Sequence, residues 1–501
     1  DQDDNWTGIR FNNYSDDAGT IVDSCTVEYA VDGINCQSSN PTITNSTFRH
    51  NTDGLDADNG SQPNITGNTF TGNTYPIRIY SRRIDGNLYG NTYQNNLQAD
   101  SASSDFIYVY GDGDNLRLSE NKTYNWLLDG APYRMMEHTH VWEHVDNNQI
   151  AVLKLHTGVK LLFEPNKHLY ISKNDNGDAG GLLADSVTFS CVDTSQTWTG
   201  IRFYNYTVDD TAYTHITNST IEYAVDGIYC ESANPTITNS TFRYNTDGVE
   251  ADAGASPILT GNSFIENTRP VSVYAQRIDS TLYGNTYTGN DKDYIEVQGD
   301  YIDENGTFTW AMDGAPYVIA GDVYVQRNNN AGQLSTLKIE TGTVVQFNDN
   351  IDLYIGHESS GNYRGALQAD GVSFTRSDDD GLWPGIDIRT HSYDEMTYLD
   401  NCIIEYATDG VYCQSSAPTI TNSTFRYNTD GVEADAGASP IVENNIFMTN
   451  TNGLKQHTSG GMSYTIGGSS AKGNEFSGNS EAGVVEVNGQ SEIHAEYNYW
   501  G

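Results

Sequence analysis

The stretch Glu28–Asp58, EYAVDGINCQSSNPTITNSTFRHNTDGLDAD, decides the fold of this chain because it occurs three times. It returns from Glu222 as EYAVDGIYC with NPTITNSTFRYNTDGVEAD, and from Glu405 as EYATDGVYC with APTITNSTFRYNTDGVEAD. The spacings between the three stretches are about 194 and about 183 residues. The residues between them also match, since DGAPY at Asp129 is repeated at Asp313. The chain therefore consists of about two and a half copies of one large repeat.

A shorter period of about 21–22 residues lies inside each copy, as Val27, Phe48 and Phe70 show in the first one. Each period holds brief alternating runs separated by Asn, Gly and Asp, which is typical of short strands joined by turns. A rung of this length cannot bury its apolar face alone but can stack on its neighbour, so the period predicts a long, stiff solenoid. The copies are predicted to form one continuous solenoid and lie at residues 1–192, 193–377 and 378–501, the last one incomplete.

The composition excludes several classes of protein. The chain has 501 residues, of which 67 are acidic and 25 basic, and its formal net charge of −42 would repel nucleic-acid phosphates and anionic lipid. No run approaches the roughly 18 consecutive apolar residues that a membrane-spanning helix needs. Because 37% of the residues are hydrophobic, the chain can bury a core, which excludes disorder as its main state. We therefore expect a folded protein without nucleic acid as a partner and without a membrane span.

Rungs of the pattern Asn-x-Phe-x-x-Asn occur at Asn68–Asn73 and Asn262–Asn267, the chain ends in Asn-Tyr-Trp-Gly from Asn498, and LKIETGTVVQF begins at Leu337. With these marks, nearly the whole chain resembles the right-handed parallel β-helix repeat proteins of bacterial and archaeal cell surfaces. The resemblance implies an all-β fold, a right-handed parallel β-helix (β-solenoid), here with rungs of about 21–22 residues and a larger internal repeat of about 183–194 residues. It also implies an extracellular or cell-surface location, but no particular reaction.

The beginning of the chain cuts the repeat in the middle. Trp6-Thr-Gly-Ile matches Trp198-Thr-Gly-Ile, but the strand expected at Asp185–Phe189 has no counterpart before the first residue. An uncapped solenoid exposes unpaired strand edges. Either flanking sequence covers these edges, or solenoids stack end to end, and a head-to-tail contact that does not close produces filaments. We therefore expect self-association as a head-to-tail or lateral homopolymer.

Pairs of aspartates recur at the rung period and are expected to stack on adjacent rungs. Two carboxylates one strand spacing apart repel each other unless a cation or a proton lies between them. Calcium, which prefers carboxylate oxygens, is therefore predicted as a cofactor. The alternative is that these side chains extend into water and cap their own turns. The predicted calcium ligands are Asp32, Asp53, Asp56, Asp58, Asp226, Asp247, Glu250, Asp252, Asp409, Asp430, Glu433 and Asp435.

The tetrad Asn-Thr-Asp-Gly at Asn51 resembles the start of the catalytic motif set of polygalacturonases, which share the expected fold. The rest of that set is missing, since the chain contains no Gly-His-Gly. The tetrad also recurs at Asn245 and Asn428, whereas an enzyme rarely repeats its active site. Glycoside hydrolysis needs carboxylates at set separations. We therefore expect no catalytic activity and interpret the tetrads as turn-forming residues.

The cysteines and sequons agree with export from the cell. Oxidation in pairs would use all six thiols, although buried free thiols are the alternative. The predicted disulfides are Cys25–Cys36, Cys402–Cys413 and Cys191–Cys230. The predicted glycosylation sites are the Asn-Ser-Thr sequons at Asn45, Asn239 and Asn422.

Two further groups of side chains have a spacing that indicates a role. His138, His140 and His144 fall close together in the first copy, and a His-x-His pair can bind zinc or copper, with a solvated cluster as the favoured alternative. Arg49, Arg243 and Arg426 recur beside the tetrads and are expected to pair with nearby carboxylates.

These observations predict a non-catalytic structural protein of the cell exterior, a β-solenoid that assembles into a surface layer, sheath or filament. One alternative is a protein that binds or degrades polysaccharide, which a groove lined by charged side chains in one copy only would support. A calcium-stiffened adhesin shaft is the other alternative. Surface polysaccharide is thus the expected partner besides the chain itself.

Overall fold

A computed structural model describes the fold of most of the chain. The described residues are 6–97, 105–111, 115–118, 121–144, 150–173, 178–328, 333–359, 363–378, 381–435, 437–457, 466, 472–487 and 498–501. Among them no helix is long and apolar enough to cross a membrane. They form β-strands and no α-helix, with three short 3₁₀ turns at Ser81–Arg83, Ala275–Arg277 and Asp394–Met396.

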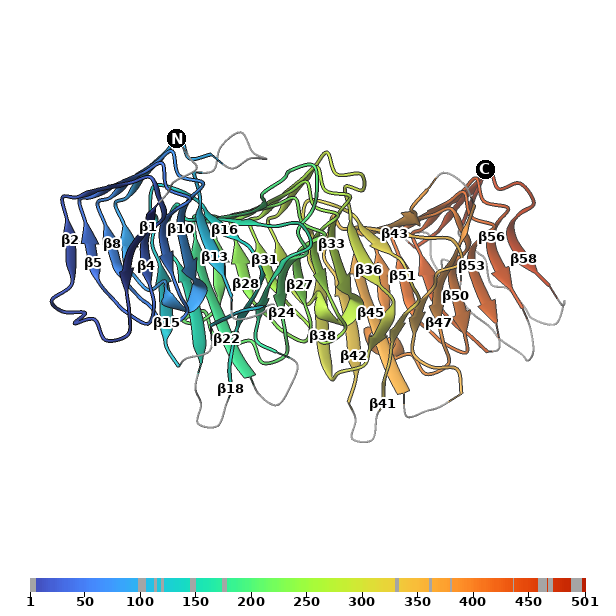
Figure 1. The fold of residues 1–501 in the computed structure, drawn as a ribbon. Helices are drawn as coiled ribbons and strands as arrows, with labels where there is room; N and C mark the ends of the chain where they lie inside the picture. The colour runs from blue at the N-terminus through green and yellow to red at the C-terminus, as the bar shows by residue number, and fades with distance from the viewer. Residues whose placement is uncertain are drawn as a thin grey trace. The chain divides into compact units, whose positions relative to one another are not determined.

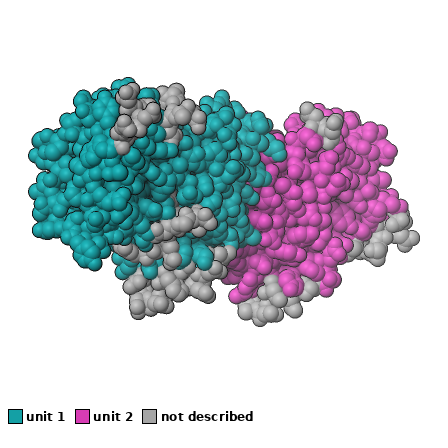
Figure 2. All heavy atoms as spheres, viewed as in Figure 1, with its two compact units in different colours: residues 1–270, 288–292 teal, residues 271–287, 293–501 magenta. Residues whose placement is uncertain are grey.

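The chain divides into two compact units, coloured separately in Figure 2. The first consists of residues 1–270 and 288–292, and the second of residues 271–287 and 293–501. The division falls within the second sequence copy.

The first unit is built of parallel ladders in which each strand pairs with a strand of the next rung. Figure 1 shows β2 (Ile21–Asp23), β5 (Thr42–Thr44) and β8 (Asn64–Thr66) side by side at the blue end, and β11 (Leu88–Tyr89) completes that ladder. A second short ladder contains β3 (Thr26–Glu28), β6 (Thr47–Arg49), β9 (Thr69–Thr71) and β12 (Thr92–Gln94).

Three longer ladders of the first unit follow the same rule. The first contains β1 (Trp6–Phe11), β4 (Ala30–Cys36), β7 (Asp53–Ala57), β10 (Tyr75–Tyr80), β13 (Ile107–Tyr110), β16 (Tyr133–Met135), β20 (Lys160–Phe163), β23 (Thr188–Cys191), β26 (Thr220–Glu222), β29 (Thr241–Arg243) and β32 (Ser263–Ile265). The second contains β14 (Asn115–Leu118), β17 (His138–Val141), β21 (His168–Ile171), β24 (Gly200–Phe203), β27 (Asp226–Cys230) and β30 (Asp247–Ala251). The third contains β15 (Thr123–Trp126), β19 (Ala151–Leu155), β22 (Asp178–Asp185), β25 (His215–Thr217), β28 (Thr236–Thr238) and β31 (Ile258–Thr260).

The second unit also contains three long parallel ladders. The first contains β36 (Ile295–Gln298), β39 (Tyr317–Ile319), β43 (Val344–Phe347), β46 (Ser373–Arg376), β49 (Ile403–Glu405), β52 (Thr424–Arg426), β55 (Ile446–Met448), β57 (Glu475–Ser477) and β59 (Tyr499–Trp500). The second contains β37 (Asp300–Ile302), β40 (Val323–Val325), β44 (Leu353–Ile355), β47 (Trp383–Ile388), β50 (Ala407–Gln414), β53 (Asp430–Asp435), β56 (Asn452–Gln456) and β58 (Ala482–Glu486). The third contains β38 (Gly306–Trp310), β42 (Ser335–Ile339), β45 (Tyr363–Asp370), β48 (Tyr398–Asp400), β51 (Thr419–Thr421) and β54 (Ile441–Glu443).

The register of the ladders confirms the predicted rung length beside the tetrads, whereas rungs between the tetrads are longer, since Ile77 pairs with Ile107 and Phe189 pairs with Ile221. Asp32 on β4 pairs with Asp53 on β7, the equivalent position of the next rung. Leu55 on β7 pairs in the same way with Ile77 on β10. The prediction of an all-β parallel solenoid is therefore confirmed, and each rung buries its apolar side chains only by stacking on its neighbours.

Aromatic side chains at the repeated Phe position form the centre of the core. In the first unit the rings of Phe48 and Phe70 stack with centroids 5.1 Å apart. In the second unit Phe447 stacks between Phe425 and Phe476, at 4.9 and 5.0 Å. All five side chains are buried. These spacings match the distance between paired strands, so one residue type at one position of the period produces a stacked aromatic column across neighbouring rungs in each unit.

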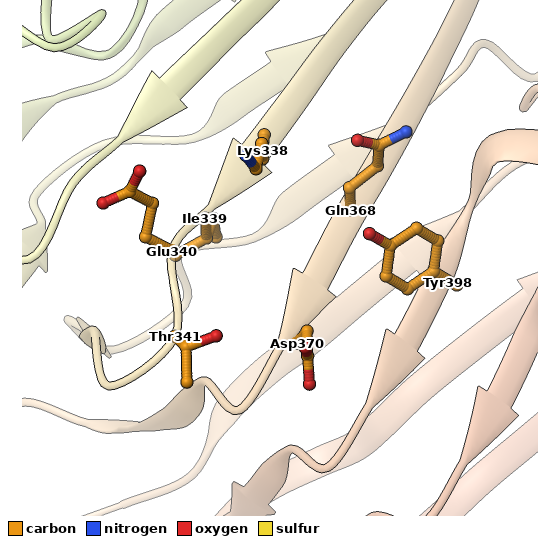
Figure 3. Close-up of a pocket in the computed structure, with 7 residues that line it drawn as sticks. All are labelled: Lys338, Ile339, Glu340, Thr341, Gln368, Asp370 and Tyr398. Carbon is orange, nitrogen blue, oxygen red and sulfur yellow. The ribbon is translucent and has the colours of Figure 1, made fainter.

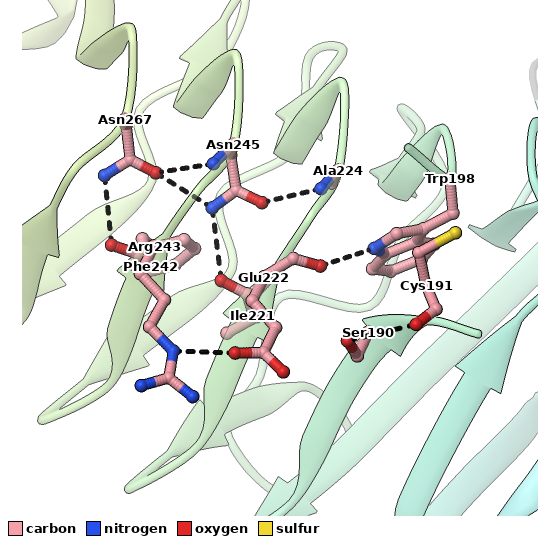
Figure 4. A network of polar contacts seen from close by, with 10 residues as sticks. All are labelled: Ser190, Cys191, Trp198, Ile221, Glu222, Ala224, Phe242, Arg243, Asn245 and Asn267. Atoms are coloured by element: carbon pink, nitrogen blue, oxygen red, sulfur yellow. Dashed lines mark hydrogen bonds and ion pairs between the residues drawn. The ribbon is translucent and has the colours of Figure 1, made fainter. Parts of the chain in front are cut away.

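A ladder of buried asparagines holds neighbouring rungs together at their corners, as Figure 4 shows for the first unit. Asn245 Oδ1 accepts from the Ala224 amide at 2.9 Å, and Asn245 Nδ2 donates to the Ile221 carbonyl at 3.1 Å. Asn245 Nδ2 also donates to Asn267 Oδ1 at 3.0 Å, and Asn267 Nδ2 donates to the Phe242 carbonyl at 3.0 Å. Each amide thus satisfies backbone groups of the preceding corner that would otherwise be buried without partners.

The recurring arginines pair with glutamates of the preceding rung, as the sequence predicts. Arg243 Nε donates to Glu222 at 2.6 Å, which is also drawn in Figure 4. Arg426 pairs with Glu405 at 2.5 Å. The same pair is present in the first copy. The arginines are half-exposed, so these pairs contribute little stability each.

Candidate functional site

The paired aspartates lie on adjacent rungs, as their spacing predicts. A glycine follows each of them because the rungs approach closely there. A Cβ at Gly33 would lie 2.5 Å from the carbonyl oxygen of Gly54, so the backbone can close only with glycine. The pairs in register are Asp32 with Asp53, Asp226 with Asp247, and Asp409 with Asp430.

In the second copy, Asp226, Asp247 and Glu250 form a cluster in which one oxygen of each lies within 4.8 Å of the others. Arg269 donates to both carboxylate oxygens of Asp247, through Nε at 2.6 Å and Nη2 at 3.0 Å. Arg202 Nη2 donates to Asp226 at 3.1 Å. Burial raises the pKa of Asp226 and of Glu250, and the two guanidinium groups oppose that rise. Side-chain cations of the protein therefore relieve the repulsion between these carboxylates.

In the third copy, Asp409, Asp430 and Glu433 form the corresponding cluster, again with oxygens within 4.8 Å. Lys455 Nζ donates to Asp430 at 2.7 Å and to Glu433 at 2.8 Å. His457 Nε2 lies 2.9 Å from the other oxygen of Glu433. Burial, followed by the charge of Glu433, raises the pKa of Asp409. The environment of Asp409 thus favours its protonated form, and the charge of Lys455 stabilises the other two carboxylates of the cluster.

In the first copy the four predicted ligands do not converge. Arg78 Nη1 donates to Asp53 at 2.9 Å. Asn35 Nδ2 lies between the other two carboxylates and donates to Asp32 at 3.2 Å and to Asp56 at 3.0 Å. Burial raises the pKa of Asp53 to about 6 despite the neighbouring Arg78. An amide and a guanidinium therefore separate the carboxylates of this copy.

The last acidic residue of each predicted calcium-ligand set forms hydrogen bonds away from the aspartate pair. Asp58 Oδ1 accepts from the backbone amides of Ser38 and Gly60, at 3.0 and 2.9 Å. Asp252 accepts from the corresponding two amides of the second copy. Asp435 accepts a hydrogen bond from a tyrosine hydroxyl at 3.2 Å. Asp58 and Asp252 therefore cap turns, as in the alternative interpretation of the sequence, and the calcium role stays a prediction for the three-carboxylate clusters.

Sequence reasoning missed the cations that neutralise the acidic clusters. The rung period predicts the positions of these cations, because Arg78 is in register with Asp56 and Lys455 is in register with Glu433. Extending the period by one rung beyond each aspartate pair would have identified them.

The three predicted disulfides are not formed, since all six cysteines are free thiols. Cys36 lies buried on β4, and burial raises its thiol pKa to about 12. Its predicted partner Cys25 is exposed between β2 and β3, outside the ladder that contains β4. Cys191 on β23 and Cys230 on β27 also belong to different ladders. The prediction was wrong because sequence spacing along a rung does not reveal which sheet a side chain enters, and the alternative of buried thiols holds for five of the six.

The predicted glycan acceptors Asn45, Asn239 and Asn422 are exposed corner residues, with φ of 48°, 51° and 51°. Asn45 Nδ2 donates to Asp23 at 2.9 Å, and Asn422 Nδ2 donates to Asp400 at 2.6 Å. Solvent reaches these side chains, and glycosylation stays a prediction.

The histidine group of the first copy differs from the predicted one. The side chain of His144 lies outside the described residues, and His168 from the next rung joins His138 and His140. The His138 and His168 rings stack with centroids 3.9 Å apart, and the Nε2 atoms of His140 and His168 are separated by 3.2 Å. Burial, followed by these two rings, lowers the pKa of His168 to about 2, so His168 is neutral in the folded protein. Metal binding here stays a prediction.

A hollow of about 420 Å³ lies on the outer side of β42, β45 and β48 in the second unit, and Figure 3 shows its lining. Lys338, Gln368 and Tyr398 occupy successive strands in register. Most lining side chains are exposed, including Lys338 and Asp370. Because water already solvates these groups, the hollow is a weak candidate for a ligand site.

The sequence model of one protein family, described as the right handed beta helix region, matches residues 2–130, 176–331 and 369–499. The matched segments include the aspartate pairs of all three copies. No curated protein and no solved structure shows a significant match to the chain.

Proposed function

The chain belongs to the right-handed β-helix family, and from this premise we propose that it is a non-catalytic structural protein of the cell exterior, a β-solenoid that assembles into a surface layer, sheath or filament. One observation carries the proposal. The same polar contacts connect adjacent rungs in successive copies, namely the asparagine ladder, the arginine–glutamate pair and the neutralised aspartate pair. Such repetition suits a structural element better than a single reaction centre.

The tetrads support a structural role rather than a catalytic one. A glycoside hydrolase needs carboxylates that face the bound substrate. The aspartates of the three tetrads are only 2% to 8% exposed, and each forms an ion pair with a neighbouring cationic side chain. The asparagines of the tetrads are Asn51, Asn245 and Asn428, all buried members of the ladder.

Charge supports assembly that depends on cations. The formal net charge of −42 keeps free chains apart in water of low ionic strength. Contacts between chains therefore need either screening salt or divalent ions that bridge carboxylates. The location outside the cell rests on the resemblance to surface proteins and on the exposed sequons.

Electron microscopy of purified native material, with and without a calcium chelator, tests the proposal. We expect long ordered polymers in the presence of calcium and shorter or dispersed particles after chelation. In the control, sodium chloride restores the ionic strength after chelation. This control separates bridging of carboxylates by divalent ions from screening of the net charge by salt. Dispersed single particles under every condition would contradict assembly. Release of reducing ends from a polysaccharide panel by the wild type, but not by Asp430→Asn, would contradict the non-catalytic role.

A further inference from the structure

Two histidines of the first unit, His140 and His168, meet across adjacent rungs. β17 carries His138 and His140, and β21 carries His168 and Tyr170. The two strands pair in parallel, with His140 in register with Tyr170. All four residues alternate with buried residues along their strands, so their side chains lie together on the outer face.

The separation of the two ring nitrogens suits a shared metal ion. His140 Nε2 and His168 Nε2 are 3.2 Å apart. Zinc bonds histidine nitrogens at roughly 2.0–2.1 Å, so two nitrogens in a tetrahedral shell lie about 3.3 Å apart. The pairing of β17 with β21 therefore already brings two donors to the spacing that a metal requires. Rotation of the rings, without movement of the strands, directs both lone pairs to one point.

Neighbouring rings hold the histidine pair in place. The ring of His168 stacks on Tyr170 with centroids 3.4 Å apart and on His138 with centroids 3.9 Å apart. His140 lies parallel to the same tyrosine, with centroids 5.1 Å apart. Tyr204 from the next rung contacts Tyr170 edge-on at 5.2 Å. Ligands that are held by packing lose less conformational freedom when they bind a metal.

A change of tautomer converts the hydrogen-bonded pair into a pair of metal ligands. Two neutral imidazole nitrogens share a hydrogen bond when one of them carries a proton and the other accepts it. A metal needs the lone pairs of both nitrogens, so the donor ring takes its other tautomer, with the proton on Nδ1. Metal binding thus replaces one N–H···N hydrogen bond with two bonds to the metal and releases no proton from the neutral rings.

The charges near the pair are compatible with a bound cation. Arg202 on the next rung donates to Asp226 at 3.1 Å. Lys167, immediately before β21, pairs with Glu137 at 3.0 Å. Carboxylates therefore neutralise these two cationic side chains. The formal net charge of −42 attracts metal cations to the chain as a whole.

The donor atoms select the class of metal. Imidazole nitrogen suits zinc, copper and nickel, whereas calcium and magnesium prefer oxygen ligands. Among the described residues, three His, Cys, Asp or Glu donors converge within 4.8 Å only in the two carboxylate clusters. The histidine pair thus supplies two protein ligands, and water fills the remaining positions around the metal.

The second copy has different donors at these positions. Because β40 and β44 are equivalent to β17 and β21, Tyr324 and Asp352 stand where the first copy has His140 and His168. The imidazole pair is therefore specific to the first of these two copies.

From these contacts we propose that His140 and His168 bind one zinc, copper(II) or nickel(II) ion through their Nε2 atoms. His138 and Tyr170 act as positioning residues, since they pack against the rings of the two ligands. This site goes beyond the structural role of the solenoid. It is also separate from the calcium sites predicted for the carboxylate clusters, because its donors are nitrogens.

Isothermal titration calorimetry with zinc, copper(II) and nickel(II) salts tests the proposal on the whole chain without an affinity tag. A Cys25→Ser background removes the exposed thiol, which is itself a ligand for these metals. Millimolar calcium is present throughout, so that it competes for the carboxylate clusters but not for imidazole. We expect one high-affinity site per chain, with copper bound most tightly.

Substitution of either ligand identifies the site. His140→Gln and His168→Gln are each expected to weaken metal binding at least tenfold. His215→Gln is the matched control, because His215 lies in another ladder, with its Nδ1 2.8 Å from the Thr211 carbonyl oxygen. Retention of wild-type affinity by both ligand variants, or an equal loss in the control, would overturn the proposal.

Electron paramagnetic resonance of the copper(II) form tests the ligands without any substitution, so its result does not depend on whether a variant folds. We expect hyperfine splitting from two nitrogens in the wild type and from one nitrogen in His140→Gln. Unfolding midpoints measured in chelator verify that the variants are folded. A wild-type copper spectrum without nitrogen splitting would overturn the proposal, and so would the absence of binding by all three metals.

Discussion

Two equivalent outer faces, one in each unit, carry different chemistry on the same core. The first face consists of β17, β21 and β24, and the second of β40, β44 and β47. Their inward residues agree closely and are buried, namely Val141 and Val325, Leu169 and Leu353, and Ile171 and Ile355. Their outward residues have diverged, from His138, His140, His168, Tyr170 and Arg202 in the first face to Asp322, Tyr324, Asp352, Tyr354 and Asp387 in the second.

The difference shows which positions the solenoid constrains. Successive strand residues point to opposite sides of the sheet, so every second residue must fit a close-packed interior. The others meet water and their neighbours one rung away. Stacking persists on both faces, since His140 lies 5.1 Å from Tyr170 and Tyr324 lies 4.7 Å from Tyr354. Planar side chains are therefore retained at these outward positions, while their charge and hydrogen-bonding groups change.

Substitution of the shared core should produce the largest effect and an equal one in both faces. Leu169→Ala and Leu353→Ala each remove a buried side chain, and we expect each to lower the free energy of unfolding by about 2–4 kcal/mol. Urea unfolding followed by tryptophan fluorescence measures the loss. Lys154→Ala on the outer side of β19 is the control and should change stability by less than about 0.5 kcal/mol. A large loss for one leucine alone would break the equivalence of the two cores.

Exchange of an outward residue between the faces tests whether the divergence has consequences. Arg202→Asp introduces the residue that the second face has there, next to the buried Asp226. We expect a loss of about 2–3 kcal/mol, because the carboxylate of Asp226 loses its partner and gains a like charge. Arg277→Met is the control, since its partner Glu304 is 55% exposed and the pair should contribute less than about 0.5 kcal/mol. A loss for Arg202→Asp no larger than that for Arg277→Met would contradict a specific role of Arg202 beside Asp226.

The two faces should respond to pH with opposite signs. The pKa of His168 is about 2 in the folded protein and 6.5 in the unfolded chain, so the unfolded chain binds more protons. The free energy of unfolding therefore decreases as pH falls from 6.5 toward 2. The pKa of Asp352 is about 6 in the folded protein, mainly because of burial, and 3.8 in the unfolded chain, so the folded protein binds more protons. The free energy of unfolding therefore decreases as pH rises from 3.8 to 6.

Variants that cannot titrate isolate each contribution to the pH dependence. As pH increases from 4 to 7, His168 should increase the free energy of unfolding and Asp352 should decrease it, each by about 1 kcal/mol after solvent screening. His168→Gln should remove that increase, and Asp352→Asn should remove that decrease. Urea unfolding at a series of pH values measures both. Stability profiles that change in the same direction for the two variants would contradict the opposite burial effects.

Calcium should have the smallest effect and should distinguish the clusters beside the two faces. The first face supplies Arg202 to the second-copy cluster, whereas the third-copy cluster has Asp387 at that point and Lys455 as its nearest cation. We therefore expect calcium to raise the thermal unfolding midpoint by about 1–3 °C through the third-copy cluster. Asp409→Asn should abolish the rise, and the matched Asp226→Asn should preserve it. A rise that survives Asp409→Asn, or a chelator that changes nothing, would contradict calcium binding there.

Periodic features were predictable from the sequence, and features that depend on side-chain direction were not. The spacing of Asp32 and Asp53 was enough to place them in register, because a parallel solenoid converts a sequence period into a contact. The contribution of His168 was missed because it lies one rung beyond His138, outside the local cluster. The cysteine pairs failed for a related reason, since the step from Cys25 to Cys36 along one rung leads to another sheet.

The sequence by itself determined the large repeat, the length of the rungs beside the tetrads and the aromatic core position, because each follows from residue types that recur at a fixed period, and its composition determined the acidic charge. The tertiary structure alone decided which cation neutralises each acidic cluster, which thiols are buried and which histidine of the next rung meets His140. The physical reason is that corners and outer faces join residues from different rungs. Their geometry depends on side-chain conformation and burial, which vary between copies that share the same period.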